Sequence, residues 1–218
     1  WGAFLAYIVG GAVIYVSAGI LAPLASRWIW HYTLGNLRYG GRPIDCDPRL
    51  ERLYGQWGLP AIVLAAGLIA MVAIALVIAF PLFTQYGESG GPSALVIIGL
   101  VYAGLVPLIG LYLVAGLLFR AGTRNVAFNE TVIDGRHVLS SSIGRWRYVW
   151  ISVSNLAATV FTLGLARPWA AIRMAHYMAS VTALDTTGSL DRYFSEIKTE
   201  GAAVGSEFMD VEGFDVGF

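Results

Sequence analysis

The side chains that could do chemistry lie in or beside strongly apolar sequence, and five of them stand out: Asn155, His31, His176, Arg167 and Arg173. Asn155 and its neighbour Ser154 lie inside an apolar segment, where a polar side chain costs free energy unless it finds a partner. The pair therefore predicts either a polar lining for a conduction path or lipid headgroup, or a structural contact. The structural contact would be a hydrogen bond between helices or a clamp on broken backbone nearby, and we favour it.

The two histidines each precede a tyrosine at the end of a long apolar stretch. Two imidazoles could share a proton or a metal ion, but neither His31 nor His176 has a second His, Cys or carboxylate at ligand spacing close by. An imidazole beside tyrosine and arginine is typical of an anchor at a membrane surface, and we assign this role to both. A third histidine, His137, lies among short β-forming residues, and we expect a solvated strand residue there.

The run Asp45-Cys46-Asp47 places two carboxylates and a thiol side by side. Adjacent residues on an extended chain point to opposite sides, so this run does not predict a metal site. Three histidines and one cysteine in these positions assemble no nucleophile with a base and an orienting acid. The sequence also has no phosphate-binding loop, dinucleotide or zinc motif. We therefore expect no catalytic residue, no cofactor and no metal, and a protein that is not an enzyme.

Arginine outnumbers lysine thirteen to one. Arginine forks suit phosphate and carboxylate groups, so membrane lipids, anionic ones included, are expected partners. Ordinary membrane topology is the plainer explanation of the same bias. Twelve arginines stand against six acids up to Leu184, whereas eight acids stand against two cations from Asp185 onward. The formal net charge is zero, which does not favour nucleic-acid binding.

The elements that position these residues are set by an apolar composition. Hydrophobic residues make up 57% of the 218 and charged residues only 13%, whereas soluble domains carry roughly 25% charged residues. The mean hydropathy is +0.66. A helix needs about 20 apolar residues to cross a bilayer, and three segments provide them: 2–26, 59–83 and 93–119. The composition therefore predicts an integral membrane protein.

Charge predicts how the two central segments are oriented. Their connection, 84–94, has no Lys or Arg, whereas arginines cluster before and after the pair. The positive-inside rule places those flanks in the cytoplasm and the connection outside. Each flank contains a turn dipeptide, Gly40-Gly41 or Asp134-Gly135, which supplies the positive φ angles of a tight hairpin. We expect two small cytoplasmic β-hairpins and cytoplasmic termini.

The stretch 164–177 repeats 19–32 at a constant offset of 145 residues. Gly164 matches Gly19 and Pro168 matches Pro23, and both copies end in His-Tyr. Proline interrupts a helix, so the glycine-to-proline step predicts a break followed by an interfacial helix with snorkelling cations. If each copy enters and returns on the cytoplasmic side, the break is a re-entrant turn; otherwise the chain has four plain spans. Basic residues at the end of both copies favour re-entry.

The stretch WISVSNLAATVFTLGLARPWAAIRMAHY, with RNVAFNETVIDGRHVL and HYTLGNLRYGGRPID, resembles the YjgN-like family of bacterial inner-membrane proteins of unknown function. Members carry a Trp, an Asn, a Thr-Leu-Gly step, a Pro-Trp-Ala step and a basic helix, commonly in two copies. The second copy here follows this pattern, whereas the first has Gly10 in place of the Asn and Leu24 in place of the Trp. The resemblance implies a multi-pass protein of the bacterial inner membrane and implies no reaction.

Together these observations predict an all-α integral membrane protein. Two central transmembrane helices are flanked by two repeated broken-helix units, re-entrant or spanning, with small cytoplasmic β-hairpins. Four consecutive segments follow: 1–58 with the first repeat and hairpin, 59–119 with the central pair, 120–188 with the second hairpin and repeat, and 189–218 with an acidic helix and tail. We also expect residues before Trp1.

The function expected from these features is non-enzymatic. One expectation is a self-associating membrane protein that either passes a small solute or ion, or organises the membrane. The alternative is an accessory subunit of a larger membrane complex, docked through its acidic tail. That tail begins with a short amphipathic helix near 190–203 and then alternates acids with Phe, Met and Val.

Overall fold

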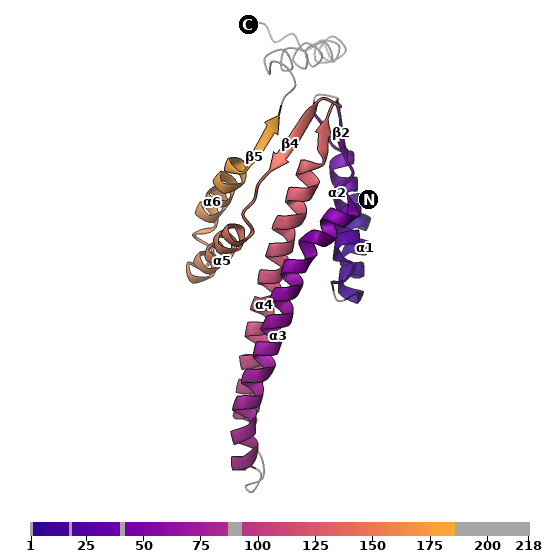
Figure 1. Cartoon of the computed structure of the whole chain (residues 1–218). Helices are drawn as coiled ribbons and strands as arrows, with labels where there is room; N and C mark the ends of the chain where they lie inside the picture. The colour runs from indigo at the N-terminus through magenta and orange to yellow at the C-terminus, as the bar shows by residue number, and fades with distance from the viewer. Residues whose placement is uncertain (1, 18, 40–41, 87–92, 186–218) are drawn as a thin grey trace. The chain divides into compact units, whose positions relative to one another are not determined.

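The computed structural model describes residues 2–17, 19–39, 42–86 and 93–185, and Figure 1 labels their elements. Within these residues the chain is mostly helical, with six helices and five short strands. The helices are α1 (Gly2–Val16), α2 (Ala22–Gly35), α3 (Leu50–Tyr86), α4 (Ala94–Asn129), α5 (Arg145–Phe161) and α6 (Arg167–Ser180). The strands are β1 (Arg38–Tyr39), β2 (Arg42–Cys46), β3 (Thr131–Ile133), β4 (His137–Ser141) and β5 (Thr182–Asp185). The predicted tail helix lies outside the described residues.

The chain divides into two compact units that each draw on separated stretches of sequence. The first unit comprises Trp1–Leu50, Asn125–Ser142 and Ser180–Phe218, and it contains α1, α2 and the strands. The second unit comprises Glu51–Arg124 and Ile143–Ala179, and it contains most of α3 and α4 together with α5 and α6. The division into four consecutive segments remains a prediction beside this grouping.

Five strands of the first unit form one antiparallel sheet in the order β1-β2-β3-β4-β5. Both predicted hairpins are present, since β1 pairs with β2 and β3 pairs with β4. The β3–β4 hairpin turns at Asp134 (φ 53°) and Gly135 (φ 63°), the left-handed conformations that an Asp-Gly turn supplies. The sequence did not predict that β2 pairs with β3 and so joins the two hairpins into one sheet. It also did not predict that β5 forms an edge strand of this sheet. The all-α class is therefore corrected to a mostly helical fold with one sheet.

The strand register fixes where the helical segments leave the sheet. Cys46 at the end of β2 pairs with Thr131 at the start of β3, so the chain leaves for α3 and returns from α4 at paired positions. Ser141 at the end of β4 pairs with Thr182 at the start of β5, so α5 and α6 are inserted in the same way. Because β2 and β4 are both antiparallel to β3, both departures lie at one end of the sheet.

The core of the first unit joins a helix of the first repeat to the sheet. A small cluster of buried or partly buried side chains forms it: Leu34, Cys46, Ala127, Trp30 and Ile44. The Trp30 ring also meets the Phe128 ring edge to face, with 6.0 Å between centroids. This packing holds α2, β2 and the end of α4 together, and it places the thiol of Cys46 inside the core.

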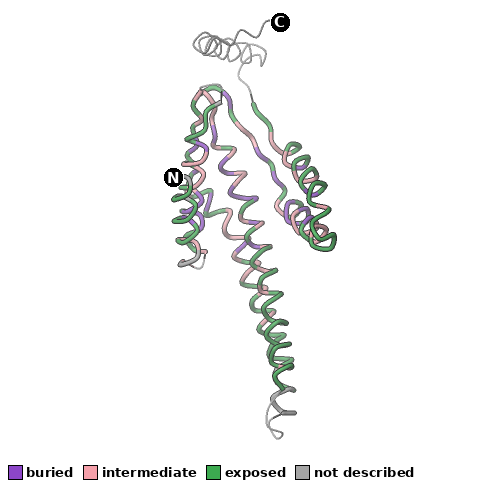
Figure 2. Tube along the Cα trace, turned by 180° about the vertical axis from the view of Figure 1, so that it is seen from behind, coloured by how far each residue is buried: buried purple, intermediate pink, exposed green. Residues whose placement is uncertain are grey.

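The two longest helices are long and apolar enough to cross a membrane, over Leu50–Ile78 in α3 and Ala94–Asn129 in α4. The most apolar window of each is unburied, and Figure 2 shows exposed surface along most of both helices. Gly67 on α3 faces Leu111 on α4, where an added Cβ would come within 2.5 Å of the leucine side chain. The small residue therefore allows the two helices to approach closely at this level.

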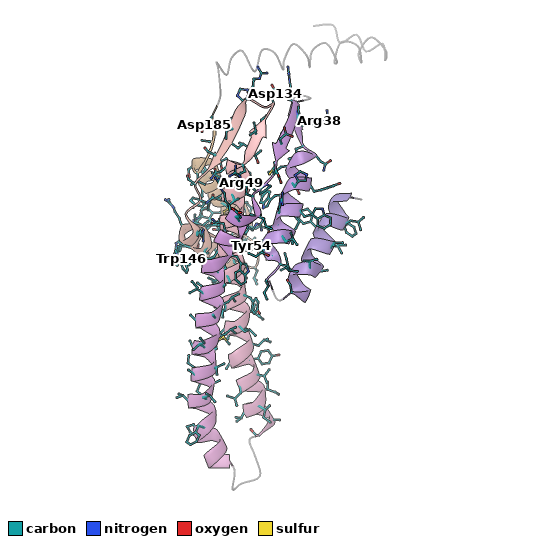
Figure 3. All side chains as sticks on the ribbon, turned by 45° about the vertical axis from the view of Figure 1, so that its right-hand side comes forward. Arg38, Arg49, Tyr54, Asp134, Trp146 and Asp185 are labelled. Carbon is teal, nitrogen blue, oxygen red and sulfur yellow. The ribbon has the colours of Figure 1, made fainter. Side chains whose placement is uncertain are left out.

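The turn between β3 and β4 predicts that the stability of this hairpin depends on pH. The Asp134 carboxylate, labelled in Figure 3, accepts hydrogen bonds from Arg136 and pairs with Arg42 at 3.6 Å. The hydrogen bond from Arg136 lowers the pKa of Asp134, and the charges of Arg136 and Arg42 add to this. A lowered pKa gives stability that is present above the ordinary value and is lost as pH falls through the folded value.

We expect amides of β3 and β4 to lose a small part of their hydrogen-exchange protection between about pH 6 and about pH 3, after correction for intrinsic rates. In Asp134→Asn this loss should shrink, because the amide tolerates the left-handed conformation but carries no titrating charge. Equal losses in both proteins would show that the ion pairs of Asp134 do not contribute.

Candidate functional site

Each of the two repeats is a pair of helices joined by a tight turn. We call α1 and α2 the first hairpin, and α5 and α6 the second hairpin. Gly19 and Gly164 both adopt positive φ, at 86° and 95°. The Gly19 N–H donates to Ile14 O at 2.8 Å, and the Gly164 N–H donates to Thr159 O at 2.7 Å. Each bond closes a helix C-terminus of the kind that needs a left-handed glycine. The predicted break is therefore confirmed in both copies.

A hydroxyl completes each turn. The sequence analysis included Thr162 in the Thr-Leu-Gly step but gave its hydroxyl no role, and it did not single out Ser17. Ser17 Oγ accepts a hydrogen bond from the Leu21 N–H at 3.1 Å, and Thr162 Oγ1 accepts one from the Ala166 N–H at 2.9 Å. Ser17 and Thr162 are separated by the same 145 residues as the glycines. A search for hydroxyls at that offset would have found them. The two repeats therefore share the hydrogen bonds of the turn as well as its sequence.

Asn155 links the two helices of the second hairpin. Its side chain is buried, at 9% exposure. Its Nδ2 donates to Ala170 O at 2.9 Å, and its Oδ1 accepts a hydrogen bond from Arg173 Nη1 at 3.0 Å. The same nitrogen of Arg173 donates to Ser154 Oγ at 2.7 Å. Asn155, Ser154 and Arg173 therefore form one polar cluster, which has the geometry of the interhelical hydrogen bond that we expected.

Aromatic rings support the arginines of this hairpin. The Arg173 guanidinium lies 5.4 Å from the centroid of the Trp169 ring, and the Arg147 guanidinium lies 5.5 Å from that of Tyr177. The Tyr177 hydroxyl donates to Gly144 O at 3.2 Å, which fixes the open end of the hairpin. Cation–π contacts of this kind hold a guanidinium in place without neutralising it. Among the described residues, no carboxylate pairs with Arg173 or Arg147.

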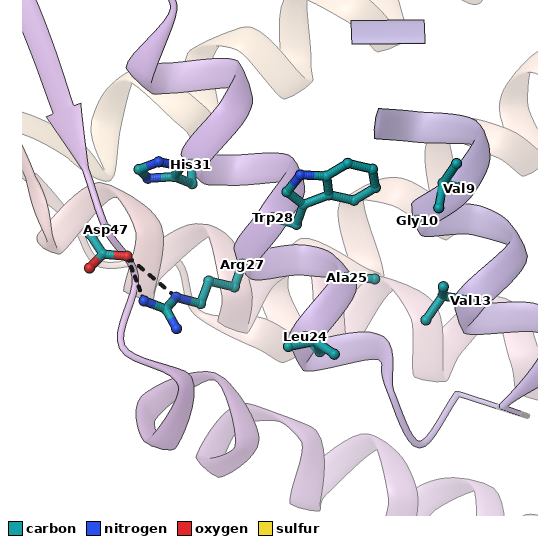
Figure 4. Close-up of a pocket in the computed structure, with 9 residues that line it drawn as sticks. All are labelled: Val9, Gly10, Val13, Leu24, Ala25, Arg27, Trp28, His31 and Asp47. Carbon is teal, nitrogen blue, oxygen red and sulfur yellow. Dashed lines mark hydrogen bonds and ion pairs between the residues drawn. The ribbon is translucent and has the colours of Figure 1, made fainter. Parts of the chain in front are cut away.

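The first hairpin has an apolar groove of about 660 Å³ where the second has its polar cluster. Val9, Gly10, Leu24 and Trp28 line it at the positions that Ser154, Asn155, Trp169 and Arg173 occupy in the second hairpin. Figure 4 shows Arg27 and Asp47 paired at the edge of this groove. An added Cβ on Gly10 would come within 2.9 Å of Ile29, so an asparagine there would not fit without rearrangement. The two hairpins therefore share a backbone but present different surfaces.

The remaining predicted residues belong to different units. His31 Nδ1 lies 2.7 Å from Cys46 O, beside the Arg27–Asp47 pair, whose closest atoms are 2.9 Å apart. The hydrogen bond from Arg27 lowers the pKa of Asp47. His176 and Arg167 are exposed on α6, in the other unit. His137 is buried at 3% exposure, so the prediction that it is a solvated strand residue is wrong. It begins β4 inside the sheet, where the period of the strand turns it inward.

Burial is expected to make the only cysteine unreactive. Cys46 is 2% exposed, and burial raises the pKa of its thiol, with the charges of Asp47 and Glu130 adding to the effect. The thiolate is the reactive form, and its population therefore rises only above the ordinary thiol pKa. We expect a maleimide to label the folded protein at least about tenfold more slowly than the denatured protein. Comparable rates would mean that the core around α2 and β2 opens readily.

The ends of both hairpins carry exposed apolar side chains. In the second hairpin Phe161, Leu163 and Leu165 are 86%, 95% and 87% exposed. In the first hairpin Ile20 is 60% and Leu24 is 46% exposed. Leu163 also has a φ of 51°, a left-handed conformation that is costly for a bulky residue. Within the described chain these side chains have little to pack against, so each hairpin ends in an apolar tip.

The fold combines two long apolar helices and two repeated helical hairpins, which are connected through one small sheet. The chain belongs to the family described as bacterial protein of unknown function (DUF898), whose profile matches residues 1–211. Comparisons with curated proteins and with solved structures gave no match. The family carries no established activity to compare with the hairpins.

Proposed function

We propose that the chain is a multi-pass protein of the bacterial inner membrane that organises the bilayer without catalysing a reaction. In this proposal α3 and α4 cross the membrane, and the two hairpins enter one leaflet from the cytoplasmic side and return. The single observation that carries it is the pair of identical turns, at Gly19 and Gly164, that each end in exposed apolar residues. The YjgN-like resemblance supports the same location.

The strand register supports re-entry. The α3–α4 segment and the α5–α6 segment each leave the sheet and return to it at paired residues, Cys46 with Thr131 and Ser141 with Thr182. The sheet cannot lie on both sides of a membrane, so each segment must cross it an even number of times. For α3 and α4 the even number is two. For the second hairpin, two complete crossings would require two full-length apolar helices.

The hairpin helices are too short for complete crossings. α5 has 17 residues and α6 has 14, which correspond to about 25 Å and about 21 Å of helix. The hydrocarbon layer is about 30 Å thick. Arg145 and Arg147 occupy the start of α5, and Arg173 lies on α6. Insertion into one leaflet buries the apolar tip and leaves these arginines at the surface. Arg167, which begins α6 two residues after Leu165, must extend its side chain toward the headgroups.

One-sided insertion supports a role as an organiser. In the proposal two short hairpins add volume to one leaflet, whereas α3 and α4 add volume to both, so the two leaflets are filled unequally. Non-helical backbone at membrane depth requires cover by protein or water. A neighbouring copy can supply this cover at the turns, and we therefore propose self-association. Passage of a small solute or ion is less well supported, because the groove of the first hairpin is its own apolar surface rather than a polar path.

The alternative, an accessory subunit docked through the acidic tail, rests on residues outside the described part of the chain. It therefore remains a prediction from sequence. Deletion of residues 204–218 tests it, since loss of a co-purifying partner on deletion would favour the accessory role over the organiser.

The proposal is tested with the full chain expressed in bacterial cells. It predicts that alkaline carbonate leaves the protein in the membrane pellet and that detergent extraction gives one homogeneous oligomer. It also predicts that reconstitution into neutral vesicles changes their diameter. Release of the protein by carbonate would contradict membrane integration. A monomer that leaves vesicle size unchanged but conducts a small ion would contradict the organiser role.

A further inference from the structure

The second hairpin carries positive charge that the described chain does not neutralise. Between Ile143 and Ala179 the sequence has four arginines and no acid. Arg173 and Arg147 both belong to this stretch, and among the described residues neither has a carboxylate partner. Their contacts are with hydroxyl, amide and aromatic groups. The hairpin is therefore electrostatically suited to an anion.

The contacts of Arg173 leave one edge of its guanidinium available. Both of its hydrogen bonds, to Ser154 and Asn155, come from Nη1. The Nε and Nη2 atoms form the other edge of the fork, which matches the spacing of two phosphate oxygens. Because Ser154 and Asn155 fix Nη1, and Trp169 lies against the guanidinium, the fork is held in one orientation before a ligand arrives. Such preorganisation lowers the entropic cost of binding.

Sequence spacing brings further groups to the same face. Arg147, Trp150 and Ser154 are three and four residues apart on α5, which places them on one side of that helix. Ser154 contacts Arg173, so this side of α5 is continuous with Trp169 and Arg173 on α6. We call these five residues the Arg173 face. Trp150 and Trp169 are 68% and 54% exposed, and exposed tryptophans are typical of the level at which a membrane meets water.

The position of the face along the hairpin matches a lipid headgroup. Arg173 lies eight residues from Leu165 in the apolar tip, or about 12 Å along the helix axis. With the tip among acyl chains of one leaflet, Arg173 reaches the depth of the phosphate. The first hairpin has Trp28 at the matching position and Gly10 in place of Asn155. The site therefore occurs in only one of the two repeats.

We propose that the Arg173 face binds the phosphate of an anionic phospholipid, held by the free edge of the Arg173 fork with Arg147 as a second cation. This inference rests on the proposed function, since it requires the second hairpin to enter a leaflet. The occupant is a lipid rather than free phosphate, because the exposed tryptophans and the apolar tip beside the arginines offer an acyl chain the contacts that a soluble anion cannot use.

The test uses full-length protein in a neutral detergent, titrated with phosphatidylglycerol or phosphatidylcholine while thermal unfolding is followed. Apparent affinities come from the dependence of the unfolding midpoint on lipid concentration. We expect phosphatidylglycerol to bind about tenfold more tightly than phosphatidylcholine, which offers the same phosphate but brings a choline cation close to the guanidiniums of Arg173 and Arg147. Arg173→Gln should remove this preference, and Arg173→Lys, which keeps the charge but not the fork, should retain part of it.

Two controls separate lipid binding from folding and from bulk charge. Arg38→Gln removes one charge from an exposed arginine on β1 and should leave the preference unchanged. Arg147→Gln loses only a contact with a tyrosine ring, and we expect it to reduce the preference about threefold. If Arg173→Gln does not fold, Arg147→Gln decides the question. An unchanged preference in the folded variants would overturn the proposal.

The source of the phosphate is tested in the same assay. Glycerol 3-phosphate that stabilised the protein as strongly as phosphatidylglycerol would overturn the assignment to a lipid. The assay is carried out in detergent and does not depend on membrane retention. A protein that carbonate releases would therefore refute the proposed function, whereas a retained protein without headgroup preference would refute only this inference.

Discussion

Asn155→Leu is expected to lower the free energy of unfolding by roughly 2 to 4 kcal/mol, because it removes a neutral and a charge-assisted hydrogen bond at a buried position. The guanidinium of Arg173 loses an acceptor, and α5 loses its polar link to α6 at Ala170. For a chain of this size each kcal/mol lowers the unfolding midpoint by roughly 2 to 4 °C. Thermal unfolding in a neutral detergent measures the change.

Two variants show whether the loss comes from these bonds. Asn155→Asp keeps an acceptor for Arg173 and adds a charge that pairs with it, but turns an oxygen instead of a donor toward Ala170 O, so its loss should be smaller than that of Asn155→Leu. Asn36→Leu makes the same change at an exposed asparagine whose Nδ2 caps Tyr32 O at 2.7 Å, and it should cost less than about 1 kcal/mol. Equal effects at Asn155 and Asn36 would argue against a structural role for the polar cluster.

Leu163→Asp is expected to expel the tip of the second hairpin from the bilayer. A carboxylate in the middle of a membrane helix costs about 2.5 to 3.5 kcal/mol. The substitution also removes the gain of about 1.5 to 3 kcal/mol from burying a leucine, so insertion of the tip becomes less favourable by about 4 to 6 kcal/mol. An environment-sensitive fluorophore on Leu165→Cys reports the change. Its emission in vesicles should be that of an apolar environment in the native background and should shift toward the value in water with Leu163→Asp.

The same substitution elsewhere provides the control. Leu37 is 49% exposed between α2 and β1, away from both tips. Leu37→Asp should leave the emission of the probe at position 165 unchanged, because the proposal keeps that position outside the bilayer. A probe that already reports water in the native background would mean that the tip lies in solvent, and the re-entrant arrangement would then be wrong.

The sequence predicted the helices of this fold well because apolar length and proline are local signals. The segments 59–83 and 93–119 became α3 and α4, although both helices extend further, through Pro60 in α3 and into the sheet-proximal end of α4. The segment 2–26 met the length of a span, but α1 ends at Val16. Only the comparison with 164–177 revealed that break, because Gly19 alone is one of many glycines.

The sheet was predicted only in part. The dipeptide Asp134-Gly135 determines its hairpin locally, and the structure confirms it. Pairing of β2 with β3, and of β4 with β5, depends on contacts between residues far apart in the chain. The strand β5 follows directly from α6 and has no turn signal of its own. Its sequence, Thr182 to Asp185, is too short to show a period.

The candidate site shows the same limit. Asn155 was singled out as a costly polar residue in apolar sequence, and Arg173 as a snorkelling cation of an interfacial helix. The turn at Gly164, however, decides which residues of α5 and α6 face each other. With that register, Asn155 reaches Arg173, whereas His31 and His176 remain in different units. The matched positions of the histidines in the repeat reflect an equivalent backbone, as the turns at Gly19 and Gly164 show.

The central claim, that the second hairpin enters the membrane and returns, is tested most directly by cysteine accessibility. Single cysteines replace Ser89 between α3 and α4, Ser142 before α5, and Leu163 at the tip, with buried Cys46 as the internal control. We predict that an impermeant maleimide labels position 89 in intact cells, labels position 142 only after permeabilisation, and does not label position 163 in either case. Labelling of position 163 from the outside would contradict the account.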